Sequence, residues 1–546
     1  MTIYYIDPTR PTNGDGSIGS PYNVHPAITA NNSYLFKSGT TYVPATEIYA
    51  NNVDNVIFDT YDWTFGSAGK PVIDAQGAFN GINLRSVDIA QVNNLNFISS
   101  TKAAGGYCGV NIAGTSAKSA SNITVNNCST KWFSGVGFYA QNSGNSLTPT
   151  LINIVFNDCY ATENRTHNFG MYGGVGTGCE FNRCISDGAG RTWSPVSPAF
   201  GSHGFTSLPQ RVTLNAGAFT ITAAPGGTTY KCTNALASFA QKVYFTAAVP
   251  SGGDTPSSNV YHITTKNTVT PTTPAQGEFG IDGNDIYVNF AWVTYTPNLM
   301  TVGIHITPFA GVTHNDCIAY DTRDVSTILG EGHGFCADDM SYHNTYIRCI
   351  AYGNEGNGFM NNQGDDTTYI GCVSMYNDTQ NRGVIAFKSA YAKNVNYIHC
   401  TGGLSLGTNT GGVEYSFTVS TYTIQNNLVL REAIKTSVNG IQDYYSVRTK
   451  ALRGNVYYKT GDANATADEA GSAIPIVFKN NPSPTNVDFT LDESCRALSN
   501  CPFAPESAGI TSITGELFNK VGTSGAYTLP FINYYREAIK EFKYIK

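Results

Sequence analysis

Hydrophobic and polar residues recur along this chain in a short phrase of two polar residues, a Cys and then small or apolar residues. The phrase occurs around Cys128, Cys159, Cys184, Cys317, Cys349, Cys372 and Cys400. Neighbouring copies lie 23–32 residues apart, except across the long gap from 184 to 317. A repeat of this length predicts structural units that stack on one another, with an insertion in the long gap.

A second phrase follows each Cys and places Gly or His before an apolar residue. It reads GVGF, HNFGMY, SHGF, GHGF, GNGF, RGVIAF and GGVEY. Each unit therefore holds two or more short strands separated by Asn- and Gly-rich turns, without long runs of helical period. We predict an all-β fold, a right-handed single-stranded parallel β-helix whose equivalent positions align in columns. A β-sandwich or propeller is the alternative.

The columns predict specific packing. Cys is a small buried hydrophobe, so the Cys residues should fill one core column. Asn side chains in turns form ladders or adopt left-handed backbone conformations. The candidates are Asn315, Asn344, Asn354 and Asn361. The total of thirteen Cys is odd, and Cys495 and Cys501 are either a local pair or free.

The texture of the chain divides it into five regions. Residues 1–45 resemble an entry cap of the solenoid, and 46–208 and 301–445 form its coils. Residues 209–300 alternate apolar and polar positions and end in the hairpin GIDGNDIYVNF, which predicts an inserted β-domain. Residues 446–546 form a capping or oligomerisation region, whose end, YYREAIKEFKYIK, predicts a helix.

Composition narrows the class of partner. The chain has 546 residues and a net charge of −7, and charged residues make up 13% against about 25% in typical soluble domains. The acidic balance argues against nucleic acid or an anionic membrane as the main partner. The sequence contains no apolar stretch of 18 residues, so it predicts no transmembrane helix. The N-terminus, MTIYYIDPTRP, lacks the basic and apolar regions of a secretory signal. Abundant Tyr, Asn and Gly suit neutral polar ligands such as sugars.

Acidic residues cluster in one stretch, residues 316–388. Adjacent coils of a β-helix are ~4.8 Å apart, so carboxylates one or two coils apart reach glycosidase-like separations. The candidate catalytic carboxylates are Glu331, Asp338, Asp339 and Glu355. The alternatives are that the two Asp residues cap a turn and that the two Glu residues are solvated.

Aligning the Gly-Phe phrases places His333, Asn357 and Arg382 in one column, which His167 and His203 join from earlier coils. The same alignment places Asp338, Asn362 and Phe387 in another column. We expect His203, His333 and Arg382 to bind substrate, although His333 could instead be a packed member of the ladder.

Two long turns predict the wall of a groove. The turn before Glu331 carries Asp321, Arg323 and Asp324, and the turn before His203 carries Asp187, Arg191 and Trp193. We expect Asp321, Arg323 and Trp193 to contact substrate, with Trp193 as a sugar platform. The alternative for Trp193 is a place in the core.

From about 330 to 405 the chain resembles the family 9 polysaccharide lyases of the pectate-lyase-like superfamily. GHGFCADD and CIAYGNEGNGFMNN match that family's coil phrases. Where the family has its calcium ligands and catalytic Lys, this chain has His333, Gly356, Asn357 and Asp338. We therefore expect neither a metal nor another cofactor.

The whole chain resembles bacteriophage tailspike depolymerases. This resemblance implies a homotrimer on the virion tail, folded in the host cytoplasm, that binds capsule or O-antigen. We expect glycoside hydrolysis by paired carboxylates. The alternatives are a lyase that uses His333, Arg382 or Lys388 near the C5 proton of a uronic acid, a non-catalytic receptor-binding spike, and a secreted plant-cell-wall enzyme.

Overall fold

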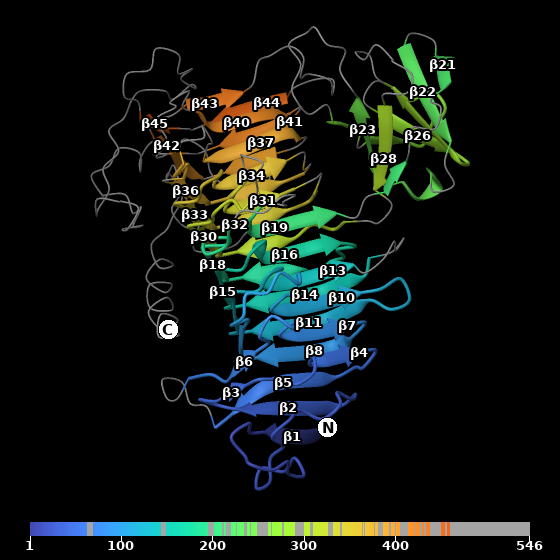
Figure 1. Cartoon of the computed structure of the whole chain (residues 1–546). Helices are drawn as coiled ribbons and strands as arrows, with labels where there is room; N and C mark the ends of the chain where they lie inside the picture. The colour runs from blue at the N-terminus through green and yellow to red at the C-terminus, as the bar shows by residue number, and fades with distance from the viewer. Residues whose placement is uncertain are drawn as a thin grey trace.

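The computed structural model of the chain describes residues 1–458 apart from short internal segments and the longer ones 248–259, 290–299, 404–412 and 437–448. Its strands stack along one axis, from β1 near the N-terminus to β44 at the far end (Figure 1). The predicted C-terminal helix, the possible Cys495–Cys501 pair, Asp339 and Arg382 lie outside the described residues. In the described part, no helix is long and apolar enough to cross a membrane.

Each coil from β2 to β43 contributes one strand to each of three parallel sheets, and β1, β44 and β45 extend two of these sheets at the ends. The thirteen-stranded sheet runs β1 (Thr2–Ile6), β2 (Asn32–Lys37), β5 (Val56–Tyr61), β8 (Asp88–Asn93), β11 (Ala120–Asn126), β14 (Leu151–Asn157), β17 (Glu180–Asn182), β29 (Thr313–Asn315), β32 (Thr345–Ile347), β35 (Thr368–Ile370), β38 (Val395–Ile398), β41 (Thr421–Gln425) and β44 (Thr449–Arg453). The twelve-stranded sheet runs β3 (Thr41–Tyr42), β6 (Val72–Asp74), β9 (Asn96–Ile98), β12 (Ser129–Lys131), β15 (Tyr160–Thr162), β18 (Ile185–Asp187), β30 (Ile318–Tyr320), β33 (Ile350–Tyr352), β36 (Val373–Met375), β39 (Thr401–Gly403), β42 (Leu428–Leu430) and β45 (Val456–Tyr458).

The eleven-stranded sheet runs β4 (Tyr49–Asn51), β7 (Ile82–Arg85), β10 (Val110–Gly114), β13 (Phe138–Asn142), β16 (His167–Gly173), β19 (His203–Pro209), β31 (Phe335–Ala337), β34 (Phe359–Asn362), β37 (Phe387–Ala392), β40 (Val413–Val419) and β43 (Ala433–Thr436). All pairs within these three sheets are parallel, in the register that a stack of coils requires. The predicted parallel β-helix is therefore confirmed.

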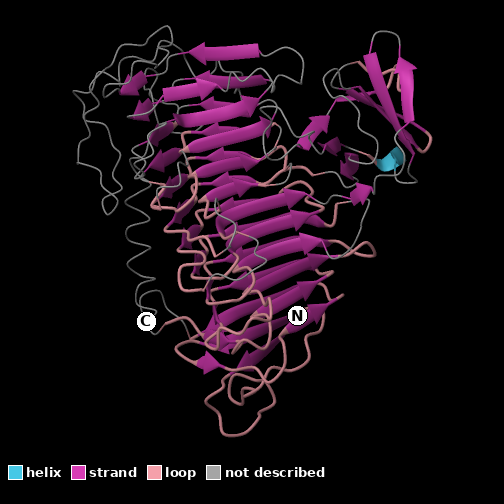
Figure 2. Cartoon of the chain, turned by 45° about the horizontal axis from the view of Figure 1, so that its top comes forward, coloured by secondary structure: helices cyan, strands magenta, loops and turns pink. Residues whose placement is uncertain are grey.

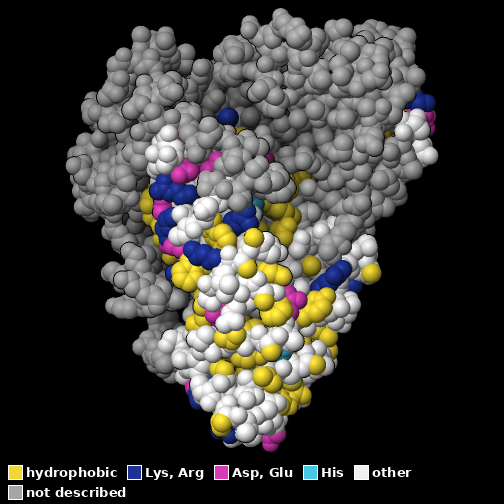
Figure 3. Space-filling view, in the orientation of Figure 1, with side chains coloured by type: hydrophobic (Ala, Val, Ile, Leu, Met, Phe, Trp, Pro, Cys, Tyr) yellow, Lys and Arg dark blue, Asp and Glu magenta, His cyan; other side chains and the backbone are white. Residues whose placement is uncertain are grey.

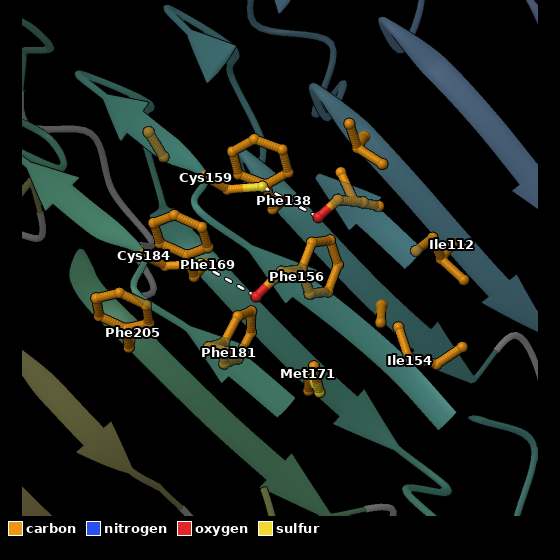
Figure 4. Close-up of a cluster of buried hydrophobic side chains, with 14 of the residues drawn as sticks. Ile112, Phe138, Ile154, Phe156, Cys159, Phe169, Met171, Phe181, Cys184 and Phe205 are labelled. Carbon is orange, nitrogen blue, oxygen red and sulfur yellow. Dashed lines mark hydrogen bonds between the residues drawn. The ribbon is translucent and has the colours of Figure 1, made fainter. Parts of the chain in front are cut away.

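The Cys column is a ladder of hydrogen bonds as well as a filler of the core. Its seven members are buried, and each thiol donates to a backbone carbonyl of the preceding coil. Cys159 donates to Val125 O and Cys184 to Phe156 O, each at 3.4 Å (Figure 4). The ten described Cys residues are all free, so this part of the fold is held without disulfides.

Phenylalanine rings form a second core column under the eleven-stranded sheet. The rings of Phe169, Phe205 and Phe335 are stacked with centroids 4.5 and 4.7 Å apart (Figure 4 shows the first two). Phe387 continues this column, stacked 4.8 Å from Phe359. The predicted alignment of Phe387 with Asp338 is therefore wrong. The sequence alignment takes Val384 of RGVIAF as the equivalent of Phe335 and Phe359, whereas the stacking aromatic that sets the register is Phe387, three residues later.

Asn ladders support the turns. Asn315 Nδ2 donates to Asn182 Oδ1 at 2.8 Å, as the last of five stacked Asn residues. Asn354 donates to Asn377 in the same way at 2.9 Å. Asn344 and Asn361 instead bond to backbone groups, at Val312 and Gly364. The ladder prediction thus holds for two of its four candidates.

The strands between β19 and β29 belong to sheets of their own (Figure 2). One contains β20 (Val212–Leu214), β28 (Met300–His305), β23 (Lys242–Ala247) and β24 (Val260–Ile263), and the other β21 (Thr220–Ala224), β22 (Gly227–Thr233), β27 (Asp285–Asn289), β26 (Glu278–Asp282) and β25 (Thr265–Asn267). The one helical element of the described residues, the 3-10 helix Ala237–Phe239, lies between β22 and β23. β24 contacts β37, which places these sheets beside the eleven-stranded sheet.

Candidate functional site

The candidate site lies where β19 and β31 begin, on the eleven-stranded sheet. These strands pair directly, Phe205 against Phe335, although the inserted strands separate them in sequence. Long turns lead into both strands from the twelve-stranded sheet. The site is therefore assembled from two turns that the insertion separates in sequence but not in space.

Three histidines form a stacked column at these strand ends, as predicted. The rings of His167 and His203 are 5.0 Å apart and those of His203 and His333 5.2 Å apart, nearly parallel. All three are buried. Loss of solvent and the neighbouring His203 hold the pKa of His167 well below its ordinary value. That residue is therefore neutral at physiological pH.

Hydrogen bonds set the tautomers of the column. The backbone N–H of Asn357 donates to His333 Nδ1 at 2.9 Å, so the ring proton of neutral His333 resides on Nε2. His203 Nδ1 is buried without a hydrogen-bond partner, which also favours a proton on Nε2. Both rings consequently present an Nε2–H group on the same side of the column.

Glu331 lies over these two Nε2 atoms. Its Oε2 is 3.4 Å from His203 Nε2 and 3.6 Å from His333 Nε2, and its side chain is 39% exposed. A Cβ at position 201 would collide with Cβ and Cγ of Glu331, so Gly201 provides the space for this side chain. Partial loss of solvent raises the pKa of Glu331; the imidazole of His203 opposes the shift, and the charges of Asp338 and Asp324 add to it.

Asp338 follows β31 directly and completes the acidic pair. Its Oδ1 accepts a hydrogen bond of 3.1 Å from Asn362 Nδ2, on the neighbouring coil. Its backbone N–H donates to Ser207 O at 3.0 Å, which fixes the chain at this point. Its charge, like that of Asp324, contributes to the raised pKa of Glu331.

The outward face of the sheet carries further reactive side chains. Phe335 points into the core, so the next residue, Cys336, points outward, and Met360 and Lys388 occupy the same column. Burial lowers the pKa of Lys388. Burial also raises the pKa of Tyr172, to which Asp338 and Cys336 contribute. Sequence reasoning missed Tyr172 and Cys336, although two-residue alternation from each core Phe marks the outward positions.

Glu355 has a different environment from Glu331, although both occupy the same column. It is 8% exposed, and its Oε2 accepts the backbone N–H of Asp324 at 2.8 Å. Its Oε1 lies 3.3 Å from Arg323, which also pairs with Asp321 at 2.5 Å. Glu355, Arg323 and Asp321 therefore hold the turn, and we leave them out of the reacting groups.

Trp193 and Asp321 belong to a second cluster, centred on Arg191. The guanidinium of Arg191 pairs with Glu163 and Asp187 at 2.8 Å and with Asp321 at 2.9 Å. Gly188 has φ 59°, and a Cβ there would come within 2.7 Å of the guanidinium carbon. The indole Nε1 of Trp193 donates to Glu163 O at 2.8 Å. Arg191 thus ties together turns of three successive coils, on both sides of the insertion.

One group of described residues has donor atoms close enough to share a metal ion. The ligand atoms of His203, His333 and Cys336 lie within 4.8 Å of one another. The two imidazole planes differ by 1° in orientation at a separation of 5.2 Å. Lone pairs of parallel rings do not converge on a common point between them, so this arrangement does not fit an ion and we assign none.

No protein-family model matches the chain, and no curated protein matches its sequence. Among solved structures it is similar to the A-module of mannuronan C-5 epimerase AlgE6 from Azotobacter vinelandii, with 12% identity, 80% and 88% of the two chains covered and a TM-score of 0.40. It is also similar to pectate lyase Pel9A (12% identity, 96% and 96%, TM-score 0.36) and to bacteriophage CBA120 tailspike protein 3 (8% identity, 83% and 59%, TM-score 0.25). Likeness this weak does not establish an activity for this chain.

Proposed function

We propose that this chain is a polysaccharide-cleaving enzyme and that it hydrolyses glycosidic bonds with Glu331 and Asp338. One observation carries the proposal: a half-exposed carboxyl with a raised pKa lies over two imidazole Nε2 atoms and within the field of a second carboxylate. Two carboxyl groups whose environments differ in this way are what an acid and a base of glycoside hydrolysis need.

The roles follow from the surroundings of each group. His203 and His333 both face Oε2 of Glu331, which leaves Oε1 to carry the acidic proton toward substrate. Glu331 donates that proton to the glycosidic oxygen as the bond to the anomeric carbon breaks. Asp338 takes a proton from the water that attacks the same carbon. His203 and His333 act as positioning residues, because they orient the acid without touching the reacting atoms.

A second candidate reaction is β-elimination on a uronic acid polymer, and Lys388 favours it. Its lowered pKa makes the neutral amine more abundant, and its column places it on the same outward face, two strands from Cys336. A neutral amine can remove the proton at C5 while the bond from C4 to the leaving oxygen breaks. The products then carry a C4–C5 double bond and absorb in the ultraviolet.

We further propose that the polymer is a bacterial capsule or O-antigen and that the chain acts as a homotrimeric tailspike. The resemblance of the whole chain to tailspike depolymerases supports this proposal. A receptor-binding spike without activity would bind such a glycan and leave its size unchanged.

The test is incubation of the full chain with a panel of capsules and O-antigens, followed by size-exclusion chromatography and mass spectrometry. Hydrated fragments identify hydrolysis, and fragments lighter by one water identify elimination. Glu331→Gln and Asp338→Asn should each reduce cleavage at least a hundredfold. Asp366→Asn is the control for loss of a carboxylate, because Asp366 lies 3.5 Å from His343 and takes no part in the proposed reaction. Full cleavage by both site variants would refute the assignment.

A further inference from the structure

Two of the four tryptophans of the chain lie in turns next to the candidate site and share one acceptor residue. The indole Nε1 of Trp132 donates to Glu163 Oε2 at 2.6 Å, and that of Trp193 donates to Glu163 O at 2.8 Å. Both rings are partly buried. Their N–H groups are thus already used, and a ligand can meet only the parts of the rings that neighbouring cations leave uncovered.

Three cations surround these rings. Lys102 Nζ is 5.2 Å from the ring centroid of Trp132 and 5.8 Å from that of Trp193. Lys131 Nζ is 4.1 Å from the Trp132 centroid, and the guanidinium carbon of Arg165 is 5.9 Å from that of Trp193. In the part of the chain that the structure describes, no carboxylate oxygen lies within the 4.0 Å ion-pair distance of these cations. The carboxylate of Glu163 is paired with Arg191 and also lies in the field of Lys131. Lys102 Nζ donates to Thr192 Oγ1 at 2.9 Å.

The backbone shows that this arrangement is held against a local preference. Trp132 has φ 66°, a left-handed conformation that bulky side chains rarely adopt. The equivalent turn positions in later coils also have positive φ, 54° at Glu163, 59° at Gly188, 54° at Asp321 and 63° at Gly353. A left-handed residue is therefore common to this turn in successive coils, and Trp132 is the bulkiest of the residues that occupy it.

Position along the axis connects these turns to Glu331. The turns after β12, β15, β18 and β30 are successive, so Trp132 and Glu331 are three coils apart, or ~14 Å at ~4.8 Å per coil. In the view of Figure 3, Lys and Arg side chains lie beside Asp and Glu side chains over the turns next to β15, β18 and β30. One extended chain can therefore reach both sites.

We infer that Trp132 and Trp193, with Lys102, Lys131 and Arg165, bind a negatively charged sugar residue of the polymer cleaved at Glu331. An indole face packs on the apolar face of a pyranose ring, and ammonium and guanidinium groups pair with its carboxylate. The substrate class is accordingly an acidic polysaccharide. This inference rests on the proposed function for the identity of the polymer, but its binding step can be measured alone.

The test uses the full chain carrying Glu331→Gln, so that no cleavage is required. Affinity electrophoresis in gels containing polygalacturonate or alginate, two uronic acid polymers, gives the dissociation constant. We expect binding that weakens with salt, and about a tenfold loss in the Lys102→Ala/Lys131→Ala variant. Lys266→Ala, which removes an exposed cation of the inserted sheets, should bind as its parent does. Methyl-esterified polygalacturonate, which lacks the charge, should bind at least tenfold more weakly.

Trp193→Ala tests the ring itself and should lose affinity for both polymers while its thermal midpoint, followed in parallel, stays above the assay temperature. The inference is overturned if neither polymer binds, if the double Lys variant binds like its parent, or if esterification has no effect. Binding that persists while wild-type chain cleaves no polymer refutes the proposed function and leaves this inference standing.

Discussion

Replacing His314 by Phe should stabilise the chain, and more so in acid. His314 is 1% exposed and lies in a core column, stacked on Tyr346 at 4.5 Å and tilted against Phe181 at 5.2 Å. Neither of its ring nitrogens has a hydrogen-bond partner. The nearby carbonyls of Val312 and Thr345 favour the charged ring slightly, but burial dominates and lowers the pKa of His314 to about 3.

The magnitude follows from linkage. The ordinary pKa of His is about 6.5, so below pH 6.5 the unfolded chain binds a proton at His314 that the folded chain does not. The stability associated with this residue is complete above pH 6.5 and falls as the pH drops toward 3. At pH 4.5, two pH units below 6.5, the loss is about 2.7 kcal/mol. The buried, unpaired ring nitrogens cost a further ~1–3 kcal/mol at every pH.

The assay is urea unfolding of wild type and His314→Phe at pH 7.5 and pH 4.5, followed by far-ultraviolet circular dichroism. The variant should be more stable at both values, and its advantage should widen by about 2.7 kcal/mol in acid. Tyr346→Phe is the control, since it removes a polar atom from the same column without a group that titrates in this interval. An advantage of the His314 variant that is equal at both pH values would refute the reasoning.

Three further predictions concern the turns and the site. Arg191→Ala should lower the free energy of unfolding by about 2 kcal/mol, because it leaves three carboxylates without their shared cation, and Arg191→Lys should restore less than half of that loss. The midpoints of urea unfolding measure both changes, and an unchanged midpoint would show that the cluster contributes nothing to stability. Asp324→Asn should move the alkaline limb of the pH profile of kcat/KM to lower pH, because removing the charge of Asp324 lowers the pKa of Glu331. An alkaline limb that stays in place would contradict the role of Glu331 as the acid. Gly201→Ala should reduce kcat at least tenfold, because the added methyl group displaces Glu331, while binding of a polymer at the tryptophans should change little. A kcat equal to that of the wild type would mean that the position of Glu331 is not critical.

The repeat made most of the fold predictable. A Cys every 23–32 residues marks the coil, because a stacked column tolerates one small buried side chain in each coil. The column of His167, His203 and His333 followed from the same register, even across the insertion. Phe387 was misplaced because two apolar residues, Val384 and Phe387, competed for the core position, and only packing decides between them.

The candidate site was less predictable, since side chains in the same column meet different neighbours. Glu331 and Glu355 occupy equivalent positions, yet Arg323 and the Asp324 backbone capture only Glu355. The backbone path of one turn decides which of the two carboxylates is left unpaired by Arg323, and the amino-acid composition of the turn does not reveal that path. Alternation from Phe169 marks Tyr172 as outward-facing, but the side chains of Asp338 and Cys336 that act on its pKa lie two coils away.

The Cys ladder also makes the order of unfolding observable. Burial raises the pKa of Cys128 to about 12 and holds the other thiols of the ladder out of solvent, so each is unreactive while its own coil is closed. Opening of a coil exposes one thiol and breaks its bond to the carbonyl of the coil before. Pulsed alkylation with mass spectrometry of the seven cysteines would therefore record, coil by coil, from which end the solenoid comes apart.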